Sequence, residues 1–238
     1  MTWLILPLFM LLLTFGAALI SLQLKGQIMP YLKYALSFAG AYLLGMTIFH
    51  LTPEVFSDEK FSKSAISFSV GFGFVLQLLL DMLSRGVEHG HFHKIKETFP
   101  ISILLGLSIH AFIEGIPLSE NFLGNKFITN AMFYGVIMHK IPAVIVLTFV
   151  LLSGGMKNKS VIFFLFIFSV MTPLGTILGY LVFDDMNSFV HSIIIGVLLG
   201  SFLHISTTIL SESARDHHYS WQKIVMILCG FVVAFFFT

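Results

Sequence analysis

The stretch from Ser160 to Phe183 reads SVIFFLFIFSVMTPLGTILGYLVF and contains no charged side chain. A helix that crosses the hydrocarbon core of a bilayer needs about 20 consecutive apolar residues, so this stretch predicts a membrane-spanning helix. Membrane β-strands would instead give short segments of alternating hydrophobicity. Similar long apolar blocks recur along the 238 residues, and the chain therefore reads as an all-α, polytopic membrane protein.

The composition agrees with this interpretation and excludes several other classes. Hydrophobic residues make up 57% of the chain and charged residues only 11%, where a soluble domain carries about 25%. An ordinary soluble enzyme needs a more polar surface, and disorder needs low hydrophobicity with high net charge. A net charge of +1 provides no basic face for nucleic acid. The single cysteine, Cys229, excludes an intramolecular disulfide.

We expect one transmembrane domain over residues 1–238, made of eight spanning helices in a bundle. The first apolar block lacks the basic n-region and cleavage site of a signal peptide, so it is counted as a span of the mature protein. The expected helices cover about residues 2–24, 31–56, 64–85, 99–119, 127–153, 160–183, 187–213 and 221–238.

The distribution of Lys and Arg predicts the orientation of these spans. Nine basic residues lie in the loops after the first, third, fifth and seventh helices, and three lie in the other loops. Because positively charged flanks remain cytoplasmic, the count places both termini outside the cytoplasm. The loop over residues 86–98 is then cytoplasmic. We expect a multi-pass protein of the cell membrane.

Ionisable residues at membrane depth are costly, and they gather in two expected helices. His110 and Glu114 are four residues apart, so they share one helix face. His139 lies near the middle of the next span. If these two helices pack face to face, the three side chains converge. Two imidazoles and a carboxylate with an open position suit zinc or a neighbouring first-row ion, so they predict a divalent metal site.

Two alternatives for these residues stay open. A buried polar network can serve only to hold helices together through hydrogen bonds. Lys140, next to His139, is itself costly in the membrane and needs an acid, and Glu114 is the nearest candidate. An ion pair between Lys140 and Glu114 would compete with metal binding.

Other polar residues in the expected spans form a candidate pathway for the ion. Each has an alternative role as a structural hydrogen-bonding group. The three histidines of the cytoplasmic loop are candidates for transient metal capture, or simply part of a solvated loop. The residues of the candidate pathway are His50, Glu54, Asp81, Thr172, His204, His89, His91 and His93.

Four motifs resemble those of the ZIP (Zrt/Irt-like) family of divalent metal transporters, in the same order along nearly the whole chain. HAFIEG at 110–115 resembles the family pattern HNxxDG, and HKIPAV at 139–144 resembles HExPHE. HLTPE at 50–54 is similar to HLLPE, and TPLG at 172–175 is similar to TPxG.

This resemblance implies a transporter and not an enzyme. Its expected cargo is a divalent metal ion carried into the cytoplasm, zinc first, with iron, manganese or cadmium as alternatives. The expected partners are the metal ion, the lipid bilayer and a second copy in a homodimer, without nucleic acid or an organic cofactor. The resemblance also implies that one helix bundle moves against another, and that both termini lie outside.

The chain departs from the family pattern at the second of the family's two adjacent metal positions. That position maps onto Ala111, Lys140, Ala143 and Thr172, which provide no carboxylate. We therefore expect one metal ion, with the Lys140 ammonium as a surrogate for the second. Two rival functions are a metal-binding or sensing homologue that does not transport and an intramembrane zinc hydrolase. The hydrolase is disfavoured because no HExxH motif is present.

Overall fold

The computed structural model describes residues 4–24, 27–84, 101–119, 126–182, 186–213 and 220–236. All regular structure within these ranges is helical, which confirms the all-α prediction. The α-helices are α1 (Ile5–Leu24), α2 (Met29–Met46), α3 (Thr52–Ser57), α4 (Lys63–Ser84), α5 (Ile101–Gly115), α6 (Lys126–Ser153), α7 (Asn158–Val182), α8 (Ser188–Ser213) and α9 (Trp221–Phe236).

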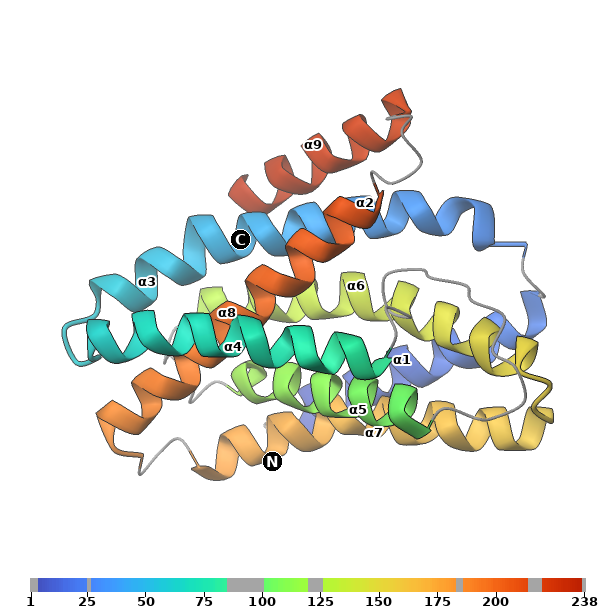
Figure 1. Ribbon diagram of the computed structural model, residues 1–238, viewed down its shortest axis with the longest axis horizontal. Helices are drawn as coiled ribbons and strands as arrows, with labels where there is room; N and C mark the ends of the chain where they lie inside the picture. Colours follow the sequence, from blue (N-terminus) through green and yellow to red (C-terminus); the bar gives the residue numbers. More distant parts are fainter. Residues whose placement is uncertain are drawn as a thin grey trace.

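The lengths and composition of these helices fit a polytopic membrane bundle. Two helical segments, Ser102–Leu118 and Trp221–Phe236, are apolar but shorter than a full span. Most of the helices lie along the long axis of the molecule, and α8 crosses it obliquely (Figure 1). Six segments are long and apolar enough to cross a membrane: Ile5–Leu24, Met29–Ser57, Lys63–Ser84, Ile128–Ser153, Asn158–Val182 and Ser188–Ser211.

The surface carries large apolar side chains, while several ionisable groups are buried. Phe68 on α4 is 81% exposed and Leu181 on α7 is 72% exposed. Water would not support so much exposed apolar area on a monomeric protein, whereas the acyl chains of a bilayer would cover it at no cost. Glu114 and Lys140, in contrast, lie in the interior.

The helices pack as two groups. In the first group α4 packs along α8, α2 packs along α9, and α2 also contacts α8. In the second group α5 packs along α7, and α1 contacts both α6 and α7. The main contacts between the groups are those of α5 with α4 and of α6 with α2. The candidate site belongs to the second group.

The expected helix over residues 31–56 is interrupted near its end. A π-helical turn, Thr47–Leu51, separates α2 from α3. Pro53 follows this turn, and because proline has no N–H it cannot continue the regular α-helical bonding. The wider turn accommodates the missing bond. His50 lies in this turn, and its Nε2–H donates a hydrogen bond of 2.8 Å to the carbonyl of Ala234 on α9.

Candidate metal centre

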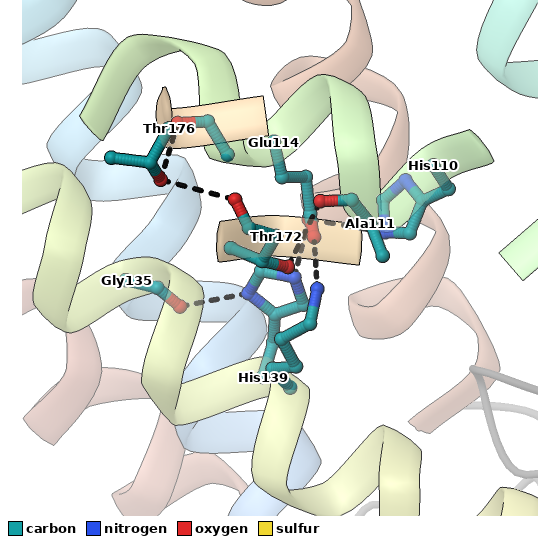
Figure 2. A network of polar contacts seen from close by, with 9 residues as sticks. His110, Ala111, Glu114, Gly135, His139, Thr172 and Thr176 are labelled. Atoms are coloured by element: carbon teal, nitrogen blue, oxygen red, sulfur yellow. Dashed lines mark hydrogen bonds and ion pairs between the residues drawn. The ribbon is translucent and has the colours of Figure 1, made fainter. Parts of the chain in front are cut away.

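The Glu114 carboxylate is the centre of a buried polar cluster between α5 and α6. On α5, His110 lies one turn before Glu114, and its Nε2 is 3.0 Å from Glu114 Oε1. His139 approaches the same oxygen from α6, with its Nε2 at 2.5 Å. Figure 2 shows both imidazoles beside this carboxylate. The side chains of the three residues are no more than 4% exposed.

The backbone of α6 fixes the orientation of the His139 ring. Its Nδ1–H donates a hydrogen bond of 2.7 Å to the carbonyl of Gly135, one turn earlier on the same helix (Figure 2). Metal-binding histidines commonly donate one ring N–H to a carbonyl, which leaves the other nitrogen to bind the ion. The Gly135 carbonyl therefore directs Nε2 of His139 toward Glu114.

Lys140 provides a second cationic contact to the same carboxylate. Its Nζ is 3.3 Å from Glu114 Oε2, so the two oxygens of Glu114 face different partners. Nζ also lies 5.1 Å from the ring centre of Phe168 on α7, a distance at which the ring face attracts a cation. Lys140 is 2% exposed. An acid and an ammonium are thus buried together, and each offsets part of the desolvation cost of the other.

Close contact between α5 and α7 holds the Glu114 helix in place. The Thr172 hydroxyl donates a 2.9 Å hydrogen bond to the carbonyl of Ala111, and the Thr176 hydroxyl donates one of 2.9 Å to the carbonyl of Gly115. A Cβ at Gly115 would overlap the carbonyl of Thr172, and a Cβ at Gly175 would overlap that of Phe112. Only glycine permits this approach of the two backbones.

The arrangement has the donor set and spacing of a divalent cation site. The ligand atoms of His110, Glu114 and His139 all lie within 4.8 Å of one another. Two ligands on one tetrahedral zinc ion are about 3.3 Å apart, given metal–ligand bonds of about 2.0–2.2 Å. The two imidazole nitrogens lie 3.0 and 2.5 Å from Glu114 Oε1, which are hydrogen-bond distances. Outward movement of these side chains by less than about 1 Å would make room for an ion. In the described part of the chain these three residues are the one cluster of this kind.

The candidate pathway residues are dispersed around this cluster. Thr172 lies next to it, and its hydroxyl donates a hydrogen bond to the backbone of α5. His50 binds the backbone of α9, and Glu54 lies one turn beyond it on α3. Asp81 and His204 approach each other between α4 and α8, with 3.8 Å between Asp81 Oδ2 and His204 Nε2.

Three of the candidate residues lie outside the described ranges. These are His89, His91 and His93 of the expected cytoplasmic loop.

Sequence reasoning missed several residues that shape the site. Phe168 and Thr176 on α7 read as ordinary apolar and hydroxyl residues of a span, and nothing in the sequence marks them. Gly135 contributes only its backbone carbonyl. Gln77 is an amide inside the apolar run VLQLLLD, four residues before Asp81, and this isolated polar residue was a usable signal.

The positions that map onto a second metal carry no acid. Ala111 and Ala143 are buried and contribute only methyl groups, and the Thr172 hydroxyl is bonded to the Ala111 carbonyl. Lys140 is the one charged residue among these four positions.

Comparison with known proteins places the chain in a family. The family model described as ZIP zinc transporter matches residues 88–238, which is more than half of the chain and includes the cluster around Glu114.

Individual relatives agree with this match. The chain is 24% identical to the zinc transporter ZIP1 of Danio rerio over 149 residues, covering 61% of this chain and 49% of the relative. It is 27% identical to the zinc transporter ZIP9-B of Xenopus laevis over 180 residues, covering 70% and 59%. It is also 25% identical to protein zntD of Dictyostelium discoideum over 165 residues, covering 62% and 24%. The chain thus spans less than two thirds of the length of each of these relatives. Because the family model matches more than half of the chain, we conclude that the chain belongs to the ZIP zinc transporter family.

Proposed function

We propose that the protein is a transporter that carries zinc ions through the membrane on His110, Glu114 and His139. The observation that carries this proposal is the convergence of these three buried ligands inside a membrane bundle of the ZIP family. A structural zinc site has four protein ligands. Three protein ligands leave one coordination position of the metal open, so the ion is held by fewer bonds and can be released. The nitrogen and oxygen donors suit zinc, and they also accept iron(II), manganese or cadmium.

The ligands have the charges that reversible binding of a cation requires. Glu114 brings one negative charge, and the two imidazoles are neutral when they bind a metal. Without metal, Glu114 instead interacts with His110, His139 and Lys140. An arriving ion replaces these hydrogen bonds with coordinate bonds. The loss of these contacts and the repulsion by Lys140 limit how tightly the ion is held, which favours its release.

Lys140 restricts the centre to one ion in this proposal. Its ammonium bonds to the oxygen of Glu114 that would otherwise face a second metal. Two divalent ions in one site need several bridging carboxylates, and the neighbouring positions Ala111 and Ala143 supply none. Lys140 therefore acts as a permanent counter-ion beside the single metal.

The packing of the helices supports a movement of the site relative to the membrane. All three ligands lie on α5 and α6, which belong to the same packing group as α1 and α7. The glycine and threonine contacts between α5 and α7 hold this group together. The group can therefore slide as a unit against the group formed by α2, α4, α8 and α9, carrying the ion with it.

We infer the orientation from the positive flanks and the direction of transport from the family resemblance. Nine basic residues on one side against three on the other favour both termini outside the cell membrane, and the resemblance implies import into the cytoplasm. A cysteine introduced at Gly90, in a Cys229→Ser background, should be protected from an impermeant thiol reagent in intact cells. Labelling of this cysteine before permeabilisation would reverse the orientation. The family resemblance further implies a homodimer.

Uptake into proteoliposomes tests the transport function directly. Reconstituted protein should accumulate zinc, and competition among zinc, iron(II), manganese and cadmium gives the selectivity. The variants His110→Ala, Glu114→Ala and His139→Ala should each lose tight zinc binding and uptake, because three ligands leave no redundancy. Retained stoichiometric binding with the wild-type affinity in all three folded variants, measured by calorimetry, would refute the site.

The same experiment separates the rival functions. Zinc binding by the wild-type protein without zinc uptake into the proteoliposomes would identify a metal-binding or sensing homologue. Turnover of a lipid or peptide without metal flux would identify a hydrolase, for which Glu114 would have to act as general base beside a zinc-bound water. We favour transport, because Glu114 has both imidazoles and Lys140 as neighbours and is better placed as a ligand.

A further inference from the structure

A second group of polar side chains lies on the paired helices α4 and α8, and two of its three members, Gln77 and His204, are buried. Gln77 on α4 is completely buried, and neither atom of its amide has a hydrogen-bond partner among the described residues. A buried amide without partners destabilises a protein by about 1–3 kcal/mol, so buried polar groups are nearly always satisfied. An amide in this state indicates a place that water or an ion occupies.

Two potential metal ligands lie on the same pair of helices, Asp81 on α4 and His204 on α8. Asp81 is one turn beyond Gln77 on α4, and i and i+4 residues share a helix face. Its Oδ2 is 3.8 Å from Nε2 of His204 on α8, which is too long for a hydrogen bond. His204 is 4% exposed, and its Nδ1 has no partner in the described part of the chain.

The distance between Asp81 and His204 suits a shared ion. Ligands on one tetrahedral zinc ion, each at about 2.0–2.2 Å from the metal, lie about 3.3–3.6 Å apart, which is close to the 3.8 Å between these two atoms. An amide oxygen, a carboxylate oxygen and an imidazole nitrogen are all donors for first-row divalent ions. The amide is a neutral ligand, and this group has one imidazole fewer than the cluster around Glu114. Weaker binding is therefore expected here.

The scaffold around this group is tight. A Cβ at Gly73 would overlap the backbone of Val197, and a Cβ at Gly200 would overlap the carbonyl of Val70. The backbones of α4 and α8 are thus in direct contact just before the level of Gln77. The ring of Phe74 packs edge to face with the His204 imidazole at 4.9 Å between centroids. Both contacts limit how far the ligands can move.

The helix register places this group within about one turn of the level of His110, which belongs to the cluster around Glu114. The helices α4 and α5 run in opposite directions (Figure 1). A Cβ at Gly106 would lie 2.8 Å from the carbonyl of Leu80, so Gly106 of α5 and Leu80 of α4 lie at about the same level of the bundle. One turn along α5 leads to His110, and one turn back along α4 leads to Gln77, so these residues lie at the same level. Asp81 is a further turn along α4, or about 6 Å.

We propose that Gln77, Asp81 and His204 form a second divalent-cation site that exchanges the ion with the cluster around Glu114. This inference rests on the proposed transport function and deepens it. The two sites lie on different packing groups, because α4 and α8 pack with each other and α5 and α6 belong with α7. Sliding of one group against the other therefore changes the distance between the sites. With the proposed orientation, the second site lies on the cytoplasmic side and receives the ion before its release.

Zinc binding to the full chain in lipid nanodiscs tests this second site. Equilibrium dialysis of the wild type should show one tight ion and one bound at least tenfold more weakly. His204→Ala should lose the weaker ion and keep the tight one, while His139→Ala should do the reverse. His191→Ala is the matched control, because His191 is also a buried histidine of α8 but packs on Phe61, and it should keep both ions.

The outcomes separate this inference from the proposed function. A weaker ion that is unaffected by both His204→Ala and Asp81→Asn, or no weaker ion at all, would overturn the second site. If the wild type binds no ion tightly, but binds a weaker ion that His204→Ala removes, the role of Glu114 is refuted and the second site is supported.

Gln77→Leu distinguishes a ligand from a structural amide. Leucine has a similar volume and no polar atoms, so without metal the thermal midpoint should stay equal or rise. The affinity for the weaker ion should fall about tenfold, because one oxygen donor is lost. A thermal midpoint several degrees lower in the metal-free variant would show that the amide is hydrogen-bonded in the folded protein, and would overturn its assignment as a ligand.

Discussion

Replacing Lys140 by methionine tests how the ammonium acts on the metal centre. Methionine keeps most of the length of the apolar stem and removes the charge. The change removes the 3.3 Å contact with Glu114 Oε2 and the interaction with the Phe168 ring. It leaves the three proposed ligands in place. We expect a less stable metal-free protein that binds zinc more tightly.

The loss of stability follows from the burial of Glu114. Removing one partner of a buried ion pair costs about 3–5 kcal/mol, because the other charge stays in the interior. Here His139 and His110 remain within 2.5 and 3.0 Å of the same carboxylate, so it keeps two hydrogen-bond partners. We therefore expect a smaller loss of about 2 kcal/mol. For a chain of this size that lowers the thermal midpoint by about 4–8 °C.

The gain in affinity follows from the repulsion between two cations. Unit charges about 4 Å apart interact by about 4 kcal/mol at the effective dielectric constant found near protein groups. A divalent ion on Glu114 would lie at a comparable distance from Nζ. Movement of the flexible side chain relieves much of this repulsion, so we expect at least about 1.4 kcal/mol, or a tenfold gain in zinc affinity.

Calorimetry and thermal unfolding with and without zinc measure both effects. Saturating zinc should restore most of the lost stability, since 100-fold excess over the dissociation constant contributes about 2.7 kcal/mol. Lys223→Met is the matched control: Lys223 is also buried, but it lies on α9 and belongs to the other packing group. Its zinc affinity should stay at the wild-type value. Lys140→Met that binds zinc no more tightly than the wild type would refute the proposed repulsion.

Three further predictions address the packing of the site and the number of ions. Gly175→Ala should destabilise the protein by about 1–3 kcal/mol, because its Cβ would overlap the Phe112 carbonyl, whereas Gly71→Ala, with open space around its Cβ, should not; thermal unfolding compares them. Thr172→Val should cost about 1–2 kcal/mol through the lost bond to α5 and keep zinc affinity within about threefold, and a loss of binding by calorimetry would make Thr172 a ligand. Lys140→Glu should raise zinc affinity, and with Ala143→His added, in a His204→Ala background, it should bind two ions per chain by elemental analysis; a single ion in that variant would contradict the surrogate role of Lys140.

The apolar pattern was sufficient to predict an all-helical, polytopic membrane protein, because the thickness of the bilayer fixes how long a spanning helix must be. The run at 160–183 corresponds to α7. The interruption before Pro53 was not predicted, because proline does not always break a helix: Pro142 and Pro173 lie inside α6 and α7. Local spacing also placed His110 and Glu114 on one face, since residues four apart stack on any α-helix. These conclusions depend on neighbours within a single helix, and a sequence specifies such neighbours directly.

Contacts between helices were accessible only from the tertiary structure. The sequence named His139 and Lys140 as candidates, but the approach of both side chains to the two oxygens of Glu114 depends on how α6 packs against α5. The gap between Asp81 and His204 and the buried amide of Gln77 depend in the same way on the contact of α4 with α8. The physical reason is that a spanning helix is equally stable in many rotations about its own axis in lipid, and only packing against its neighbours selects one.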